Sequence, residues 1–338
     1  MKCMPKSPKV SICIPTYNRI ELFRATLRSV LCQTFTDFEI IVSDNASQED
    51  ISRLIQETND PRIRFYEQSK NLGAAANFLF LQTLPKGVYL LFLCSDDLLL
   101  PDCLEKAVRV LDLNPTRGGV VYMAAHYGEG GFECLSTMPA LPNADADVYR
   151  KNREVMNFRF TSPSVCLYRR ATFESLGGWD KELLAIIDWE MYSRMVRKGG
   201  GICYLHQVLA IMRMHNNRHS NTSAMHWDFF HDVLILSSRP GLRGGGLVEA
   251  RAVMEQLLWD LRLRRRPWAT LRHAWKYGAM KSFVLLLPFE IIRRILVKGT
   301  VLASWRRRGD VPSRISPLDT PFDRDAADAF WNKMVSEP

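Results

Sequence analysis

The first 123 residues alternate two hydrophobic patterns, and this alternation limits the possible folds more than any other feature of the chain. Short apolar runs typical of buried strands are separated by stretches whose apolar residues recur every three or four positions, as on one face of a helix. Such strand–helix units predict an α/β fold in which helices cover a mostly parallel sheet. The expected strands are 9–14, 38–43, 62–67, 88–94 and 119–123, and the clearest helices are 20–32 and 102–113.

Polar residues directly follow four of these strands. Open α/β sheets bind ligands in the crevice at the carboxyl ends of their strands, so we expect the four clusters to meet at one ligand site. Helix capping or a turn would explain any one cluster alone, but four together favour a site. The clusters are Thr16–Arg19, Asp44–Ser47, Lys70–Gly73 and Ser95–Asp97.

Two adjacent acids, Asp96 and Asp97, close an apolar run. Buried carboxylates are costly unless they are paired, hydrated or bound to a cation. Mn²⁺ and Mg²⁺ take carboxylate oxygens and are usually completed by substrate phosphates and water, which suits a nucleoside diphosphate. A turn followed by the cap of the helix at Asp102 explains the same residues, and both interpretations stay open at this point.

The second half of the chain reads as a second lobe followed by a helical extension. The signals weaken over 125–150, and order resumes near Phe160. A turn at Gly177 and Gly178 then precedes a helix-like stretch that begins near Asp188. Beyond Trp227 the pattern is mostly helical and ends in a short amphipathic segment at 324–334.

The net charge of +9 is concentrated in one region. Residues 262–308 hold thirteen Lys and Arg against one acid, Glu290, whereas the rest, with 32 basic and 35 acidic residues, carries −3. Because this region is also rich in Leu, Ile, Phe and Trp, it favours a peripheral anionic membrane surface as partner, and we expect no nucleic acid. A solvated basic helix face is the alternative. Its most apolar part, 283–305, is interrupted by charges and is a poor membrane span.

The cysteines and the N-terminal residues indicate the cellular compartment in which the protein is expected. Eight cysteines are scattered, and no pair has the spacing of a zinc or redox site. Several lie in apolar runs, as expected of reduced, buried thiols. The first ten residues, MKCMPKSPKV, lack the apolar core of a signal peptide. We therefore expect a cytoplasmic protein, with its basic region peripheral on the inner face of the cell membrane.

Seven short segments occur in a specific order along residues 8–223. They are VSICIPTYNR at 10–19, IVSDNAS at 41–47, NLG at 71–73, SDD at 95–97, LGGWD at 176–180, DWE at 188–190 and RMH at 213–215. Each is weak alone, but the ordered set resembles the inverting family 2 glycosyltransferases of the GT-A fold, of the bacterial surface-polysaccharide type. That fold is a Rossmann-like mixed, mostly parallel sheet flanked by helices. The resemblance implies a catalytic domain at 1–225, with a nucleotide-binding half at 1–124 and an acceptor half at 125–225, and a helical basic region at 226–338.

The resemblance implies a nucleoside diphosphate sugar, with UDP or dTDP favoured, and Mn²⁺ or Mg²⁺ as cofactor. Asp44 would accept a hydrogen bond from the base, Asp96 would face the ribose or sugar, and Asp97 would hold the metal. His215 would contact the metal or the diphosphate. The remaining residues expected around the nucleotide sugar are Pro15, Thr16, Tyr17, Arg19, Asn45, Asn71 and Arg213.

The resemblance also implies a base that takes the proton of the acceptor hydroxyl. The family usually supplies the Asp of a Glu-Asp pair at the start of a helix, which matches Asp188, and Ile187 stands where the Glu usually is. Tyr192, Arg194 and Gly199 keep the family spacing, so the assignment stands without its acidic neighbour. The expected acceptor-pocket residues are Trp179, Asp180, Trp189 and Glu190.

Taken together, these features predict a metal-dependent hexosyltransferase that acts by single displacement on a surface glycan or lipid-linked acceptor. One alternative is a sugar-phosphate nucleotidylyltransferase, which expects a glycine-rich basic loop after the first strand, and residues 16–19 contain no glycine. The other is a catalytically silent glycosyltransferase-like binding protein, which Ile187 favours.

Overall fold

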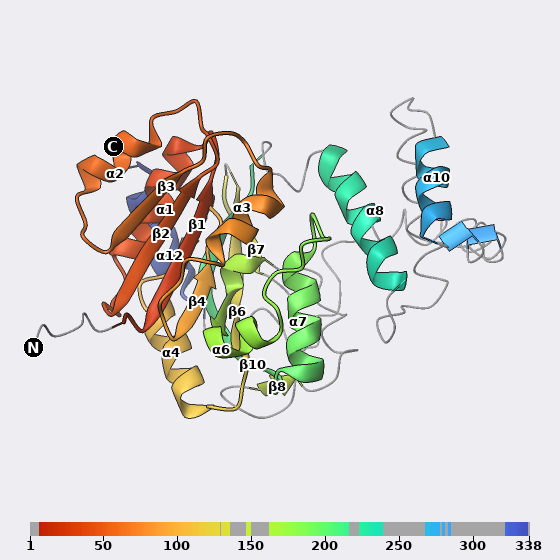
Figure 1. Ribbon diagram of the computed structural model, residues 1–338. Coiled ribbons are helices and arrows are strands. Elements are labelled where there is room, and N and C mark those ends of the chain that lie inside the picture. The colour runs from red at the N-terminus through yellow and green to blue at the C-terminus, as the bar shows by residue number, and fades with distance from the viewer. Residues whose placement is uncertain are drawn as a thin grey trace, which may run out of the picture. The chain divides into compact units, whose positions relative to one another are not determined.

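Ten strands form one mixed sheet in the part of the chain that the computed structural model describes (Figure 1). The described residues are 7–128, 130–135, 147–149, 162–215, 223–238, 268–277, 279–280, 283–284 and 322–336. The strands are β1 Val10–Thr16, β2 Phe38–Asp44, β3 Ile63–Glu67, β4 Tyr89–Phe92, β5 Asp97–Leu99, β6 Gly119–Gly128, β7 Gly131–Leu135, β8 Asp147–Tyr149, β9 Cys166–Arg169 and β10 Ile202–Arg213. The helices are α1 Ile20–Leu31, α2 Ile51–Thr58, α3 Ala74–Leu81, α4 Cys103–Leu113, α6 Arg170–Ser175, α7 Ile187–Lys198, α8 Ser223–Ser238, α10 Trp268–Lys276 and α12 Arg324–Ser336, with a 3₁₀ turn, η1, at Pro163–Val165.

The chain divides into two compact units. The first contains residues 1–181, 187–215 and 313–338, and the second contains 182–186 and 216–312. The domain division expected at residue 225 stays a prediction. Within the described residues, no helix is long and apolar enough to cross a membrane. Most of the basic region at 262–308 lies outside them.

One half of the sheet is parallel, as the sequence pattern predicts, in the order β3-β2-β1-β4. Most of β1 is buried on both faces, which explains why its sequence is an almost continuous apolar run rather than an alternating one. The register pairs Thr16 with Asp44 at the carboxyl ends of β1 and β2. The polar residues that follow these two strands therefore begin side by side.

The other half of the sheet is largely antiparallel, which the predicted strand–helix alternation did not anticipate. β9 lies between β4 and β6 and is antiparallel to both, and β5 is antiparallel to β10. β10 runs parallel to β6, with register shifts near Val208. The β5–β10 register pairs Asp97 with Met212. This pairing brings the acid turn at 95–97 beside the end of β10, more than a hundred residues further along the chain.

A buried aromatic cluster joins the turn before α7 to the sheet. Trp179 is 2% exposed and packs edge-on against Phe92, Phe173 and Tyr168, with ring centroids 4.9, 5.1 and 5.6 Å away. Gly177 and Gly178, the expected turn, have φ of 93° and 69°, a region that side chains disfavour. Trp179 is therefore a core residue of the first compact unit.

Replacing Trp179 by Ala should lower the free energy of unfolding by about 3–5 kcal/mol, because the change empties a large buried site. Urea unfolding followed by circular dichroism measures this loss. Leu113→Ala is the control, since Leu113 is 73% exposed and its removal should change stability by no more than about 0.5 kcal/mol. A loss below about 1 kcal/mol in Trp179→Ala would contradict the core assignment.

Candidate active site

Hydrogen bonds join the loops after β1 and β2 at the carboxyl edge of the sheet. The Asn45 amide donates to the Thr16 carbonyl at 2.9 Å, and the Asn18 amide donates to Ser47 Oγ at 2.8 Å. Asn18 and Ala46 have positive φ angles of 49° and 62°. Asn enters this region readily, whereas Ala46 is held there at a cost in strain. The two loops thus form one ordered rim.

Asp44 lies in this rim, at the end of β2, and is 3% exposed. Its carboxylate accepts hydrogen bonds from the backbone N–H and the hydroxyl of Ser47. Burial raises the pKa of Asp44, and the bonds from Ser47 oppose that rise. Beside it, the Asn45 side chain donates to Asn71 Oδ1 at 2.9 Å and accepts from the Leu72 amide at 2.8 Å. The structure therefore brings the clusters after β1, β2 and β3 together.

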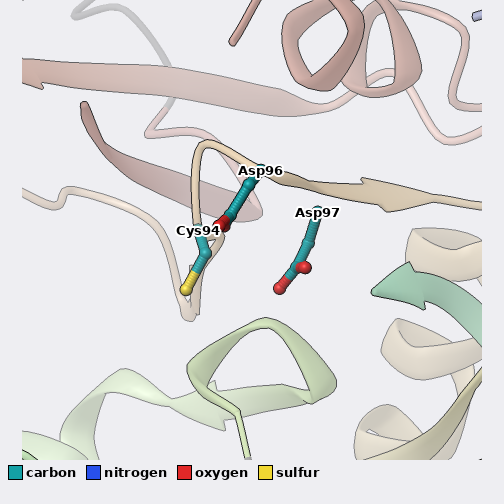
Figure 2. A group of neighbouring side chains, drawn as sticks. All are labelled: Cys94, Asp96 and Asp97. Atoms are coloured by element: carbon teal, nitrogen blue, oxygen red, sulfur yellow. The ribbon is translucent and has the colours of Figure 1, made fainter. Parts of the chain in front are cut away.

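Figure 2 shows Cys94, Asp96 and Asp97 gathered at the turn that leads into β5. One donor atom of each side chain lies within 4.8 Å of the others. Asp97 is fully buried, and its Oδ2 accepts from Ser164 Oγ at 2.7 Å. The same hydroxyl accepts from the Cys94 amide at 3.0 Å. Ser164 thereby fixes both the Asp97 carboxylate and the backbone of the turn.

Asp96 meets two basic side chains from distant parts of the sequence. Its Oδ2 lies 3.0 Å from Arg19 Nη1 and 3.2 Å from His215 Nε2. Arg19 follows β1, Asp96 follows β4 and His215 follows β10, so three strand ends converge here. The Arg19 and His215 side chains remain 26% and 19% exposed. The guanidinium charge of Arg19 is therefore accessible to an anionic ligand at this edge.

Arg213, which was expected near the phosphates, makes buried contacts with the protein. It is 4% exposed, and its Nε donates to the Asp96 carbonyl. Its Nη2 donates to the Leu22 carbonyl and to Thr26 Oγ1, the latter at 2.9 Å. Burial lowers the pKa of Arg213 to about 10. These contacts tie the acid turn to α1.

Asp188 lies in the first turn of α7, as the sequence predicts, and is 6% exposed. One helical turn further on, the Tyr192 hydroxyl donates to the Ser162 carbonyl at 3.0 Å. Ser162 Oγ in turn lies 3.5 Å from Asp97 Oδ2. Burial raises the pKa of Tyr192, and charge at Asp188 adds to the rise. A short polar chain therefore links the helix of the expected base to the acid turn.

The four expected acceptor residues fall into two classes. Trp179 lies in the aromatic core, and Glu190, 1% exposed, pairs with Arg194 at 2.6 Å. Arg194 also donates to the carbonyls of residues 176 and 178, so this pair holds the turn before α7. Asp180 and Trp189 are half-buried. Only these last two expose much surface to a second substrate.

Sequence reasoning missed the residues that position the site. Ser164, Thr26 and Tyr192 each bond to the turn or to its supports across large sequence separations. Ser164 belongs to the ordered stretch predicted to follow Phe160, but no local pattern marks a serine as the partner of an acid 67 residues away. Only the assembled sheet shows these partnerships.

The donor set at the turn suits a hard divalent cation. Asp96 offers a carboxylate oxygen and His215 an imidazole nitrogen 3.2 Å away, both of which bind Mn²⁺. Asp97 Oδ2 is already engaged by Ser164. Cys94 is the exception, because a thiol is softer than the oxygen ligands that Mn²⁺ and Mg²⁺ prefer.

Comparisons with known sequences agree with this geometry. Residues 11–177 match the family model described as Glycosyl transferase family 2. An uncharacterized glycosyltransferase of Rickettsia typhi is 25% identical over 230 residues, which cover 66% of this chain and 69% of that protein. Chondroitin synthase of Escherichia coli is 40% identical over 105 residues, which cover 30% of this chain and 15% of that much longer protein.

Solved structures share the fold at low identity. S. aureus TarS in complex with UDP-GlcNAc has a TM-score of 0.53 and 17% identity, covering 74% of this chain and 72% of that one. A mannosyltransferase from Pyrobaculum calidifontis in complex with GDP-Man and Mn²⁺ has a TM-score of 0.54 and 18% identity, covering 92% and 83%. The expected GT-A fold, a mixed sheet flanked by helices with a helical C-terminal part, is thus confirmed. The chain is a glycosyltransferase, and its residues 11–177 belong to glycosyltransferase family 2.

Proposed function

We propose that this enzyme uses Mn²⁺ or Mg²⁺ to transfer a sugar, with inversion, from a nucleoside diphosphate sugar to a glycan or lipid-linked acceptor. The observation that carries the proposal is the convergence of Arg19 and His215 on Asp96 at the carboxyl edge of the sheet. The departing diphosphate gains negative charge as its bond to the sugar breaks, and the preorganised guanidinium of Arg19 would stabilise that charge in the transition state.

The nucleotide is proposed to bind over the rim formed by the loops after β1 and β2. Tyr17 directly follows β1 and is 39% exposed, so its ring would be available to stack on a base. Asp44 would accept a hydrogen bond from that base, and Pro15 and Thr16 would line the pocket. The bound UDP-GlcNAc and GDP-Man in the two similar structures support a nucleotide sugar as donor. UDP and dTDP remain our proposed carriers.

The metal is proposed to bind at Asp96 and His215, with Asp97 as a supporting carboxylate. The family resemblance assigns the metal to Asp97, but full burial and the bond from Ser164 favour a positioning role for that residue. Asp96 lies beside the more exposed His215 and Arg19. A divalent cation held there would offset charge on the leaving diphosphate.

Asp188 is proposed as the general base. Its carboxylate would take the acceptor hydroxyl proton as that oxygen attacks the anomeric carbon from the face opposite the diphosphate. The bond from the anomeric carbon to the phosphate oxygen breaks, and its electron pair leaves with the nucleoside diphosphate. Ile187 is 6% exposed, so in this chain the position of the usual acid packs inside the protein. Asp180 and Trp189, both half-buried, are our candidates for acceptor contacts.

Asp188→Asn should lower kcat by about 10²–10⁴-fold, because the amide cannot accept the proton, while the Kd for the nucleotide sugar changes by less than about twofold. Radiolabelled sugar transfer and calorimetry measure the two quantities. Glu174→Gln on α6, an exposed acid, is the matched control and should keep both values.

Retained turnover in Asp188→Asn would remove Asp188 from the mechanism. The same assay on the wild-type protein tests the alternative of a catalytically silent binding protein. If it binds nucleotide and metal but neither hydrolyses nor transfers the sugar with any acceptor, the enzymatic proposal is wrong and a binding role replaces it.

Asp96→Asn should raise the apparent Kd for Mn²⁺ in the presence of UDP by about 100-fold, and Asp97→Asn by about tenfold, as expected when a ligand and its support are changed. Electron paramagnetic resonance of free Mn²⁺ measures both values without turnover. A larger effect in Asp97→Asn, in protein of normal stability, would return the ligand role to Asp97. Chelation of the metal should abolish transfer by the wild type, and added Mn²⁺ should restore it.

We also propose that α10 contacts an anionic membrane surface. Trp268 and Trp275, seven residues apart on one helix face, are 71% and 77% exposed. Arg272 and Lys276 lie on the same helix and are also exposed. The surrounding sequence at 262–308 has thirteen basic residues and one acid, which complements anionic lipid headgroups. Exposed tryptophans beside basic residues are typical of helices that lie in the membrane interface.

Replacing both Trp268 and Trp275 by Ser should lower partition into vesicles with 30% anionic lipid by about tenfold, because two large rings no longer enter the interface. Vesicle sedimentation measures the partition. Leu113→Ser, which changes an exposed leucine of α4, should leave it unaltered. Equal partition of the double variant and the wild type would exclude α10 as the contact.

A further inference from the structure

The C-terminal helix α12 folds back onto the first compact unit, where it packs against α1. Asp323 caps its start, since Asp323 Oδ1 accepts from the Ala326 amide at 2.9 Å. Ala327 and Met334 are each 3% exposed. The helix is thus anchored at its start and along its buried face.

α12 contacts Tyr127, which lies near the end of β6. Tyr127 is fully buried, and its hydroxyl donates to Asp328 Oδ1 at 2.7 Å. Its ring stacks on Trp331 with centroids 4.9 Å apart and planes 26° apart. One turn of α12 therefore holds both the polar and the aromatic part of a single side chain.

The backbone of Tyr127 in turn holds the segment that carries His215. Arg213 pairs with Tyr127 in the β6–β10 register, and the Met214 amide donates to the Tyr127 carbonyl at 2.6 Å. The next residue, His215, places its ring nitrogen 3.2 Å from Asp96. An unbroken path of contacts leads from α12 to Asp96, the carboxylate that we propose as a metal ligand.

This path of contacts passes through Met214 and His215, the two residues that directly follow β10. Upstream, β10 is fixed by β6 on one side and β5 on the other, but β5 pairs no further than Met212. Beyond that point the Tyr127 carbonyl holds Met214 directly. A helix that fixes Tyr127 therefore affects the positions of Met214 and His215, which follow β10, more than the positions of the paired residues within the strand.

We propose that α12 is a positioning element of the donor site. Trp331 and Asp328 hold Tyr127, whose carbonyl holds Met214 and thereby keeps the next residue, His215, beside Asp96. The inference rests on the proposed function for its catalytic meaning. Small displacements of such groups weaken catalysis and binding, because the site must be held within about 0.5 Å of its productive geometry.

Hydrogen exchange at residues 208–215 and calorimetry with UDP and Mn²⁺ test the proposal on the full chain. Trp331→Ala and Asp328→Ala should speed exchange of the Met214 amide by about tenfold and weaken UDP binding by about fivefold. The donor KM should rise similarly, with kcat at saturation nearly unchanged. Trp331→Phe and Asp328→Asn, which keep an aromatic ring and an acceptor, should restore most of both. Lys333→Ala, on the exposed face of α12, is the matched control.

Unchanged exchange at Met214 in folded Trp331→Ala overturns the proposal, and so does faster exchange with unchanged UDP affinity. Should Trp331→Ala fail to fold, Tyr127→Phe removes only the hydroxyl bond to Asp328 and must show the same effects in weaker form. A wild type that binds no nucleotide would defeat the proposed function, whereas the exchange measurement would still decide whether α12 holds the end of β10.

Discussion

The buried guanidinium of Arg213 is the constraint on which the site depends. A planar group with donors on separate nitrogens bonds the carbonyl of Asp96 and two oxygens of α1 at once. Burial of the charge is costly and lowers the pKa of Arg213. The protein accepts that cost because these bonds fix the turn that presents Asp96. The position of Asp96 at this edge thus depends on Arg213, a residue that is itself buried.

Around that constraint the site divides into a facing layer and a supporting layer. Arg19, Asp96 and His215 keep partial exposure at the sheet edge. Asp97 and Ser164 are completely buried and hold the turn from within. Two adjacent acids in the sequence therefore have different partners, because Asp97 at the start of β5 is fully buried against Ser164, whereas Asp96 lies beside Arg19 and His215. A metal site needs such support, since ligands act well only when their own positions are fixed.

Two further helices, α7 and α12, are connected to this turn. α7 is tied to it through Tyr192 and Ser162, and α12 through Tyr127. The proposed reaction needs the acceptor oxygen and the leaving diphosphate on opposite faces of one carbon. The contacts of α7 with the acid turn, through Tyr192 and Ser162, would keep the proposed base and the donor site in a fixed relation.

The sequence by itself determined the parallel half of the sheet, the polar strand ends and the family. These are local properties: hydrophobic period, turn residues and ordered motifs are readable within windows of ten to twenty residues. It also placed Asp188 in the first turn of a helix. The antiparallel half was not readable, because strands such as β9 and β5 take their places from partners far along the chain.

Only the tertiary structure decided which contacts the expected site residues make. Trp179, Glu190 and Arg213 have the residue types of sugar and phosphate ligands, yet the fold encloses each of them among protein partners. Conversely, Ser164 and Tyr127 carry no motif and became important through contacts with residues 67 and 201 positions away. Residue type sets what a side chain can bind, but burial and neighbours set what it does bind. Those two properties exist only after the chain has folded.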